Sequence, residues 1–264
     1  MGLLSPKALV KVKNLGIKIP ETTSGGLELL SGISHDFLSG KISVFVGSET
    51  DEKSSFLRAI GGSLRKYTGS IEVNGVDIRN NPESLITSLF LISESISYEF
   101  PSTLKELPKT LKKHFENWDI SVYSQFLNHF GISSDTRFSQ LNDRQKKQVL
   151  CSISLASHVP VLIYENVESF LDPKVEALFY DYLRIRSQMG ASIIMSSCRV
   201  STWKNHASYD LYRIKEGRLY RIDQEKLNYK AWVKQKERAA NGFGHFDDTQ
   251  NTWSITMTSL SNDR

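Results

Sequence analysis

The stretch that decides the fold is residues 141–173, which read LNDRQKKQVLCSISLASHVPVLIYENVESFLDP. Within it, Val161–Tyr164 is a short apolar run of the kind that forms a strand buried on both faces. Pro173 suits the first turn of a helix, and we predict that this helix continues to about Gln188. The stretch therefore predicts a buried strand, a polar loop and a helix, in that order.

The same succession of short strands and helices continues on both sides of this stretch. Ile42–Val46 is apolar and rich in β-branched residues and ends at Gly47, and we predict that a helix begins near Lys53. Two further short apolar runs, 89–92 and 191–195, are predicted as strands. Short strands that alternate with helices indicate a parallel α/β sheet.

Other segments predict antiparallel strands. Residues 8–13 and 27–37 alternate between apolar and polar side chains as half-buried strands do. Asn74-Gly75 lies between apolar alternations and predicts a β-hairpin over 69–78. A last hairpin is predicted over 209–222.

The pattern also predicts the domain organisation. Apolar residues recur at helical spacing over 104–158, so we predict a helical subdomain at about 95–158 within a first domain of residues 1–222. The remainder, 223–264, is predicted to be a charged helix that gives way after Asn241 to a polar tail.

Composition excludes several classes of protein. The 264 residues carry a net charge of only +4, with basic residues spread along the chain, which argues against a dedicated nucleic-acid surface. Cys151 and Cys198 form no disulfide framework, which favours a reducing cytoplasm. No apolar run reaches the roughly 20 residues of a membrane span, and the N-terminus lacks the pattern of a signal peptide.

In the order of its elements and motifs, the chain resembles the ATPase domains of ABC transporters over roughly residues 8–222. Leu141–Gln145 stands where that family has its LSGGQ signature, and Ser169–Pro173 matches the turn called the D-loop. The strand between them and its acidic end stand where the Walker B motif belongs. Phe115–Asp119 also resembles a subgroup of bacterial export-type subunits. The resemblance implies an α/β, P-loop NTPase-like ABC ATPase domain with an antiparallel β subdomain and a helical subdomain.

The phosphate loop of the family, Gly-x-x-x-x-Gly-Lys-Ser/Thr, corresponds to the segment that begins at Gly47. The resemblance implies that four residues bind nucleotide: Gly47, Lys53, Ser54 and Ser55. Three carboxylates stand in or beside this cradle: Glu49, Asp51, and Glu52 in place of the second glycine. One carboxylate at about 4 Å from a phosphate charge costs on the order of 4 kcal/mol at an effective dielectric near 20. The same acids also stabilise a helix N-terminus, so weakened nucleotide binding and a locally favourable helix start both remain open.

The Walker B position implies the metal and the catalytic chemistry. By the resemblance, Ser54 and Glu165 are the implied magnesium ligands, although Glu165 is one methylene longer than the aspartate of the family. Asn166 replaces the catalytic glutamate and cannot act as a base, because an amide accepts no proton at neutral pH. Cys198 occupies the position of the switch histidine, and Glu94 corresponds loosely to a glutamine of the family. No catalytic residue is therefore assigned.

The signature normally lets one subunit clamp ATP that is held by another. Asn142, Asp143 and Arg144 replace its serine and two glycines, while Gln145 is kept. Asp143 puts an acid where close backbone approach is needed. Arg144 either offers a charge to phosphate, pairs with Asp143 or lies in solvent. Asp172 keeps the acid of the D-loop.

Three hypotheses for the function follow. The first is a degenerate, non-hydrolysing ABC transporter ATP-binding subunit on the cytoplasmic face of a membrane. It docks on a permease and forms a homo- or heterodimer with another ATPase subunit, and ATP with magnesium binds weakly. The helical subdomain has apolar faces that carry Phe126, Leu127 and Phe130. Part of this surface must pack on the α/β core, and the remainder is the predicted docking patch. The alternative is that these residues only complete the core of the subdomain. The second hypothesis is a slow but genuine ATPase subunit, and the third is a nucleotide-independent adaptor or regulatory protein built on the same fold.

Overall fold

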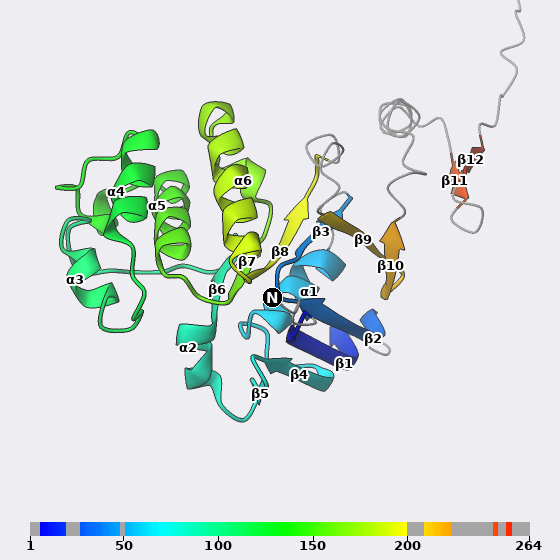
Figure 1. The fold of residues 1–264 in the computed structure, drawn as a ribbon. Helices are drawn as coiled ribbons and strands as arrows, with labels where there is room; N and C mark the ends of the chain where they lie inside the picture. Colours follow the sequence, from blue (N-terminus) through cyan, green and yellow to red (C-terminus); the bar gives the residue numbers. More distant parts are fainter. Residues whose placement is uncertain are drawn as a thin grey trace, which may run out of the picture. The chain divides into compact units, whose positions relative to one another are not determined.

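The computed structural model describes six segments of the chain: 6–19, 27–47, 51–199, 209–222, 245–247 and 252–254. The chain divides into two compact units, Met1–Arg221 and Ile222–Arg264. The first unit contains two sheets and every helix that the described segments form (Figure 1).

The central sheet has six strands in the order β10-β9-β3-β8-β7-β6. Their bounds are Ile42–Val46 for β3, Leu89–Ile92 for β6, Val161–Tyr164 for β7, Ser192–Ser197 for β8, Tyr209–Lys215 for β9 and Arg218–Ile222 for β10. The pairs from β9 through β3, β8 and β7 to β6 are all parallel. Every residue of β3, β7 and β8 is buried, because helices or the second sheet cover both faces of these strands. The predicted parallel α/β sheet is therefore confirmed.

The second sheet is antiparallel and has the order β2-β1-β4-β5. Its strands are Ala8–Ile19 for β1, Leu27–Leu38 for β2, Thr68–Val73 for β4 and Val76–Asp77 for β5. At the turn between β4 and β5, Asn74 and Gly75 have φ values of 51° and 84°. Asparagine and glycine tolerate this left-handed backbone best, which is why the Asn-Gly pair predicts the hairpin correctly. β1 extends beyond its predicted end.

The described segments of the chain form six α-helices around the sheets: α1 Asp51–Ile60, α2 Leu85–Ser88, α3 Leu107–Leu111, α4 Ile120–His129, α5 Asp143–Ala156 and α6 Pro173–Gln188. Short 3₁₀ turns cover Pro82–Ser84, Phe138–Gln140 and Val167–Ser169. α3, α4 and α5 form a lobe to one side of the central sheet, and α6 lies between this lobe and β7 and β8 (Figure 1). We call α3–α5 the helical lobe.

An aromatic cluster fixes α1 against both sheets. Phe45 of β3 lies with its ring centroid 5.1 Å from that of Phe56 in α1. Phe37 of β2 lies 6.1 Å from Phe45, and Tyr212 of β9 stacks on Phe45 at 5.5 Å. Fully buried aromatic pairs of this kind add to the stability supplied by apolar burial. The cluster therefore holds the first turn of α1 beside the end of β3.

Two of the three apolar residues named with the docking patch are not available to a partner. Phe126 and Leu127 are 0% and 2% exposed, as the alternative that they pack within the protein predicts. The ring of Phe126 lies 6.2 Å from that of Phe179 and 4.9 Å from that of Tyr182, both in α6. Phe130 is half-buried and packs on Phe126. These side chains join the lobe to α6 because burying them there removes apolar surface from water.

None of the helices within the described segments combines the length and the apolar character that crossing a membrane requires. The charged helix predicted from Asp223 lies outside the described residues. In the second unit, β11 (His245–Asp247) pairs antiparallel with β12 (Thr252–Ser254). The sequence does not predict this pairing.

Candidate functional site

The loop between β3 and α1 is closed by a lysine. Gly47 follows β3 with a φ of 134°, a conformation that favours glycine. Lys53, on the first turn of α1, is 5% exposed, and its Nζ donates to the carbonyl oxygen of Gly47 at 2.6 Å. Residues 48–50, which include Glu49, lie outside the described residues. Ser54 is half-buried and Ser55 buried on the same helix, so the predicted phosphate-loop residues are brought together.

Glu52 is directed away from this loop. Its Oε1 accepts from the backbone N–H of Gly217, at the turn between β9 and β10, at 2.9 Å. Burial lowers the pKa of Arg213, and the charge of Glu52 opposes that shift. Asp51 is exposed in the first turn of α1, where a carboxylate suits the helix dipole. The contact of Glu52 therefore reduces the electrostatic penalty that the sequence predicts for phosphate.

The end of β7 places Glu165 and Asn166 at the same edge of the sheet as Gly47, with β8 between their two strands. Glu165 is 7% exposed and accepts a hydrogen bond from Ser93, which directly follows β6. The backbone N–H of Glu165 donates to the carbonyl oxygen of Ile92 at 2.8 Å. Gly47 and Glu165 therefore lie at the same edge of one sheet.

Glu165, the carboxylate implied as a magnesium ligand, has partners within its own chain. One of its oxygens is committed to Ser93, and the ammonium of Lys147 is near enough to interact electrostatically with it. Magnesium requires near-ideal octahedral geometry with oxygen ligands and resident water. Within the described segments, no group of three or more His, Cys, Asp or Glu side chains is arranged to hold a metal ion.

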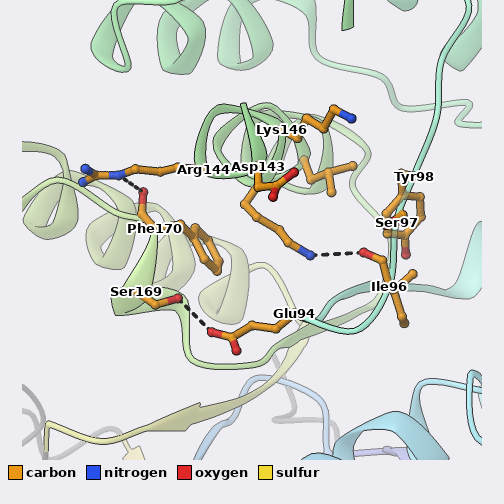
Figure 2. A pocket seen from close by; sticks show the side chains of 11 residues that line it. Glu94, Ile96, Ser97, Tyr98, Asp143, Arg144, Lys146, Ser169 and Phe170 are labelled. Carbon is orange, nitrogen blue, oxygen red and sulfur yellow. Dashed lines mark hydrogen bonds between the residues drawn. The ribbon is translucent and has the colours of Figure 1, made fainter. Parts of the chain in front are cut away.

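Asn166, which stands at the position of the family's catalytic glutamate, forms a hydrogen bond with another carboxylate, that of Glu94. It has a φ of 49°, a left-handed conformation that asparagine tolerates better than most residues. Its backbone N–H donates to Ser196 Oγ at 3.0 Å, and its side-chain Nδ2 donates to Glu94 Oε1 at 3.3 Å. The same oxygen accepts from Ser169 Oγ at 3.2 Å, a contact visible in Figure 2. A carboxylate and an amide therefore face each other at this point.

The residues at the start of α5 form a helix cap. Asn142 Oδ1 accepts from the backbone N–H of Gln145 at 2.9 Å, and Asn142 N–H donates to Gln145 Oε1 at 3.2 Å. This reciprocal pair is a capping box, which satisfies backbone donors that a helix start leaves unpaired. Asp143 is exposed in the first turn. Asn142 and Gln145 therefore stabilise the helix start locally.

Arg144 is exposed, with 51% of its side-chain surface accessible, and its ion-pair partner is Asp172 rather than Asp143. A terminal guanidinium nitrogen of Arg144 lies 2.7 Å from Asp172 Oδ1. Its Nε donates to the carbonyl oxygen of Phe170 at 3.3 Å, a contact drawn in Figure 2. Gln148 donates from Nε2 to the same carbonyl at 3.0 Å and to Asp172 Oδ2 at 3.3 Å. The fork of five guanidinium donors makes arginine able to grip a carbonyl and a carboxylate together. Arg144 is thus turned to the 170–172 turn of its own chain.

Known proteins with a similar sequence include ATP-binding proteins of transporters. No family model matches the chain. The chain is 26% identical over 167 residues to the achromobactin transport ATP-binding protein CbrD of Dickeya dadantii, covering 59% of this chain and 62% of that protein. It is 24% identical over 212 residues to an ATP-dependent lipid A-core flippase of Francisella tularensis, covering 75% of this chain and 34% of the flippase. It is 29% identical over 195 residues to the ABC transporter ATP-binding protein YybJ of Bacillus subtilis, covering 72% and 85%. The chain thus spans less than two thirds of the first two relatives.

Solved structures agree with these relatives. An ATP-binding subunit of an ABC transporter superposes with a TM-score of 0.69 at 18% identity, covering 88% of this chain and 98% of that one. A dimeric ATP-binding cassette with bound ADP and phosphate superposes with a TM-score of 0.68 at 14% identity, covering 81% and 98%. The chain has the fold of an ABC-type nucleotide-binding domain and is similar in sequence to ABC transporter ATP-binding proteins.

Sequence reasoning missed one acidic residue of this ABC-type domain. Glu168 Oε1 accepts from Ser197 Oγ at 2.7 Å and from the backbone N–H of Cys198 at 2.6 Å. Arg199, whose guanidinium also lies 3.3 Å from Glu176, adds a third donor to Glu168 through its backbone N–H at 3.3 Å. Glu168 therefore ties the loop after β7 to the end of β8. Glu168 follows the predicted strand that became β7, and its partners follow the predicted strand that became β8. This shared position after two parallel strands is the sequence signal for the contact.

The ABC-type domain has a pocket of about 440 Å³ beside the start of α5, lined by both polar and apolar side chains. Its walls come from the segment after β6, the first turns of α5 and the D-loop, as Figure 2 shows. The cationic side chains in these walls have partners within the chain. Arg144 contacts Asp172, and Lys146 lies 3.2 Å from Glu99. Lys147 donates to backbone carbonyl oxygens of the segment after β6.

Proposed function

We propose that the chain is a degenerate, non-hydrolysing ATP-binding subunit of an ABC transporter. It docks on a membrane permease at the cytoplasmic face and pairs with another ATPase subunit, as a homo- or heterodimer. The ABC-type fold and the relatives named as transport ATP-binding proteins support the transporter class. A solved exporter with bound ATP, of which the chain covers 43%, has the same fold at a TM-score of 0.69 and 19% identity.

One observation carries the loss of hydrolysis. At the point where the resemblance implies a catalytic carboxylate, Asn166 presents an amide whose Nδ2 is committed to Glu94. An amide of this kind cannot take the proton of an attacking water. Glu165, the implied metal ligand beside it, is bound to Ser93. These two contacts support the proposed loss of ATP hydrolysis.

Weak nucleotide binding remains part of the proposal. Gly47, Lys53, Ser54 and Ser55 lie together at the start of α1, where backbone N–H groups and the helix dipole favour an anion. The turn of Glu52 toward Gly217 removes one carboxylate from that cradle. Asp51 stays exposed in the same helical turn and still opposes a phosphate.

The decisive experiment compares nucleotide binding with phosphate release. We expect equilibrium binding of a fluorescent ATP analogue to be weak and to decrease further in Lys53→Ala. We expect steady-state phosphate release to be the same in the wild type and in Lys53→Ala. Phosphate release that is clearly above the Lys53→Ala control would overturn the proposal.

A slow ATPase is the second candidate, and one observation favours it. Glu94 places a carboxylate 3.3 Å from the amide of Asn166, so an acid remains at this edge of the sheet. If it activated water, phosphate release by the wild type would be measurable and would fall in Glu94→Gln. Asn166→Ala, which removes the amide and leaves the acid, is the matched control.

Partner capture separates a transporter subunit from an adaptor. The tagged chain would be expressed with its neighbouring genes, and membranes would be extracted in mild detergent. We expect a multi-span protein and a second ATPase subunit to co-purify. Recovery of the tagged chain from the soluble fraction without either partner would favour the adaptor hypothesis.

A further inference from the structure

One face of α5 is directed to the α/β core. Arg144, Lys147 and Gln148 are spaced i, i+3 and i+4, so they project from the same side of the helix. These three side chains reach two core segments that are far apart in the sequence, 93–96 after β6 and 170–172 in the D-loop. α5 belongs to the helical lobe, so this face is where polar contacts connect the lobe to the core.

Lys147 holds the first of these segments. Its Nζ donates to the carbonyl oxygen of Ser93 and, at 3.1 Å, to that of Ile96. Burial lowers the pKa of this lysine, and the nearby carboxylates of Glu94 and Glu165 oppose the shift. A charged donor that is partly removed from water makes stronger hydrogen bonds than a neutral one. The segment through which the chain leaves β6 for the lobe is thereby tied back to α5.

Arg144 and Gln148 hold the second segment. Both donate to the carbonyl oxygen of Phe170, at 3.3 and 3.0 Å, and both reach the carboxylate of Asp172. One carbonyl and one carboxylate therefore receive four contacts from two side chains of one helix turn. The start of α6 follows directly at Pro173, so this contact also positions α6 relative to α5.

The two core segments are joined to each other as well. Glu94 Oε1 accepts from Ser169 Oγ at 3.2 Å and from Asn166 Nδ2 at 3.3 Å. The contacts thus run in a closed ring from α5 to the segment after β6, through Glu94 to the D-loop, and back to α5. We call the residues that make these contacts the polar ring: Ser93, Glu94, Ile96, Arg144, Lys147, Gln148, Asn166, Ser169, Phe170 and Asp172. Every contact in the polar ring is made between atoms of this chain.

We propose that the polar ring is a conformational lock, which holds the helical lobe in one orientation on the central sheet without any nucleotide. A closed set of contacts restrains rotation better than separate ones, because no segment can move without breaking two of them. The cavity of about 440 Å³ lies at the ring, which also contributes part of its walls. The lock stands on these contacts and is independent of whether the chain hydrolyses ATP.

A spin-label distance measurement tests the lock. One label is placed on the lobe at Ser124→Cys in α4, and the other on the core at Lys41→Cys before β3; both positions are exposed. Cys198→Ser removes the half-buried native thiol, and Cys151 is fully buried and does not take up a label. In the wild-type ring, we expect one narrow distance distribution that saturating ATP with magnesium does not shift.

The ring is then opened by Arg144→Met with Lys147→Met, and the matched control is Lys146→Met. Lys146 is the neighbouring lysine on the same helix, and its partner Glu99 lies outside the ring. We expect the double variant to broaden or shift the distribution and the control to match the wild type. A double variant with an unchanged distribution, or a wild-type distribution that ATP shifts, would overturn the lock.

Hydrogen exchange gives a second readout that does not depend on the double variant being stable. In Arg144→Met alone, we expect amide exchange in 169–172 to rise about tenfold, since the contacts of Arg144 to Phe170 and Asp172 are lost while those of Gln148 remain. Exchange there in Lys146→Met should match the wild type, and equal exchange in both variants would contradict the lock. Measurable ATP turnover with an unmoved wild-type lobe would refute the proposed function and leave the lock intact.

Discussion

Replacing Asn166 by glutamate restores the acid that the ABC-type resemblance implies, yet we expect it to destabilise the protein. The amide of Asn166 donates to Glu94 Oε1 at 3.3 Å, so a glutamate at this position would place two carboxylates against each other. Asn166 is 8% exposed, which leaves the new charge little room to turn into water. The substitution should therefore fail to create ATPase activity and should lower the free energy of unfolding.

The size of the effect comes from charge and from the lost hydrogen bond. Two unit charges about 4 Å apart repel by about 1 kcal/mol in bulk water and about 4 kcal/mol at an effective dielectric of 20. Glu94 is exposed to solvent, so the repulsion belongs near the lower of these values. The lost hydrogen bond adds about 1 kcal/mol. We expect the free energy of unfolding of Asn166→Glu to be lower by about 2 to 3 kcal/mol.

The assay is urea unfolding of five proteins at pH 7: the wild type, Asn166→Gln, Asn166→Glu, Glu94→Gln and the double variant of Asn166→Glu with Glu94→Gln. Asn166→Gln has the length of glutamate without its charge, so it measures the cost of the longer side chain in a left-handed backbone. Asn166→Glu should be less stable than Asn166→Gln by most of the predicted difference. Adding Glu94→Gln to Asn166→Glu should restore stability. In this double variant, the amide at position 94 can donate to the carboxylate at position 166, which is the reverse of the wild-type hydrogen bond.

Two outcomes would refute this reasoning. Equal stability of Asn166→Glu and Asn166→Gln would mean that Glu94 does not face the side chain at 166. Failure of Glu94→Gln to recover stability would mean that the loss has another cause. The coupling energy from the double-mutant cycle isolates the interaction between the two positions.

Three further predictions concern the supporting structure. Tyr123→Phe should cost about 1 to 1.5 kcal/mol in urea unfolding, because the buried hydroxyl donates to Leu104 O at 2.9 Å; an unchanged midpoint would contradict this contact. Phe126→Ala should cost about 3 to 5 kcal/mol, whereas Ile120→Ala on the same helix, at a side chain 50% exposed, should stay within about 0.5 kcal/mol; similar losses would contradict the burial of Phe126. Burial lowers the pKa of His35 from its usual 6.5, so the unfolded state binds more protons just below that pH. The free energy of unfolding should therefore fall as pH decreases through that range, and a pH titration should show a smaller fall in His35→Asn.

Local patterns in the sequence determined most of the fold. Val161–Tyr164 and Ile42–Val46 are strands because short apolar runs are stable only when covered on both faces. Asn74-Gly75 accepts the positive φ values that a tight hairpin needs, and Pro173 starts α6 because its missing N–H is not required there. Each of these features depends on neighbouring residues, so the sequence alone was sufficient.

Only the tertiary structure decided what the altered motif residues contact. Arg144 and Asp172 are 28 residues apart, and Glu94 and Asn166 are 72 residues apart, so no local spacing links them. The sequence pattern also could not predict that Phe126 of α4 packs on Phe179 of α6. An apolar helix face predicts that a side chain is buried, but it does not predict which element the side chain packs against. Polar side chains choose among several partners of similar energy. Which partner is within about 3 Å depends on how helices and strands pack, and that is a property of the whole fold.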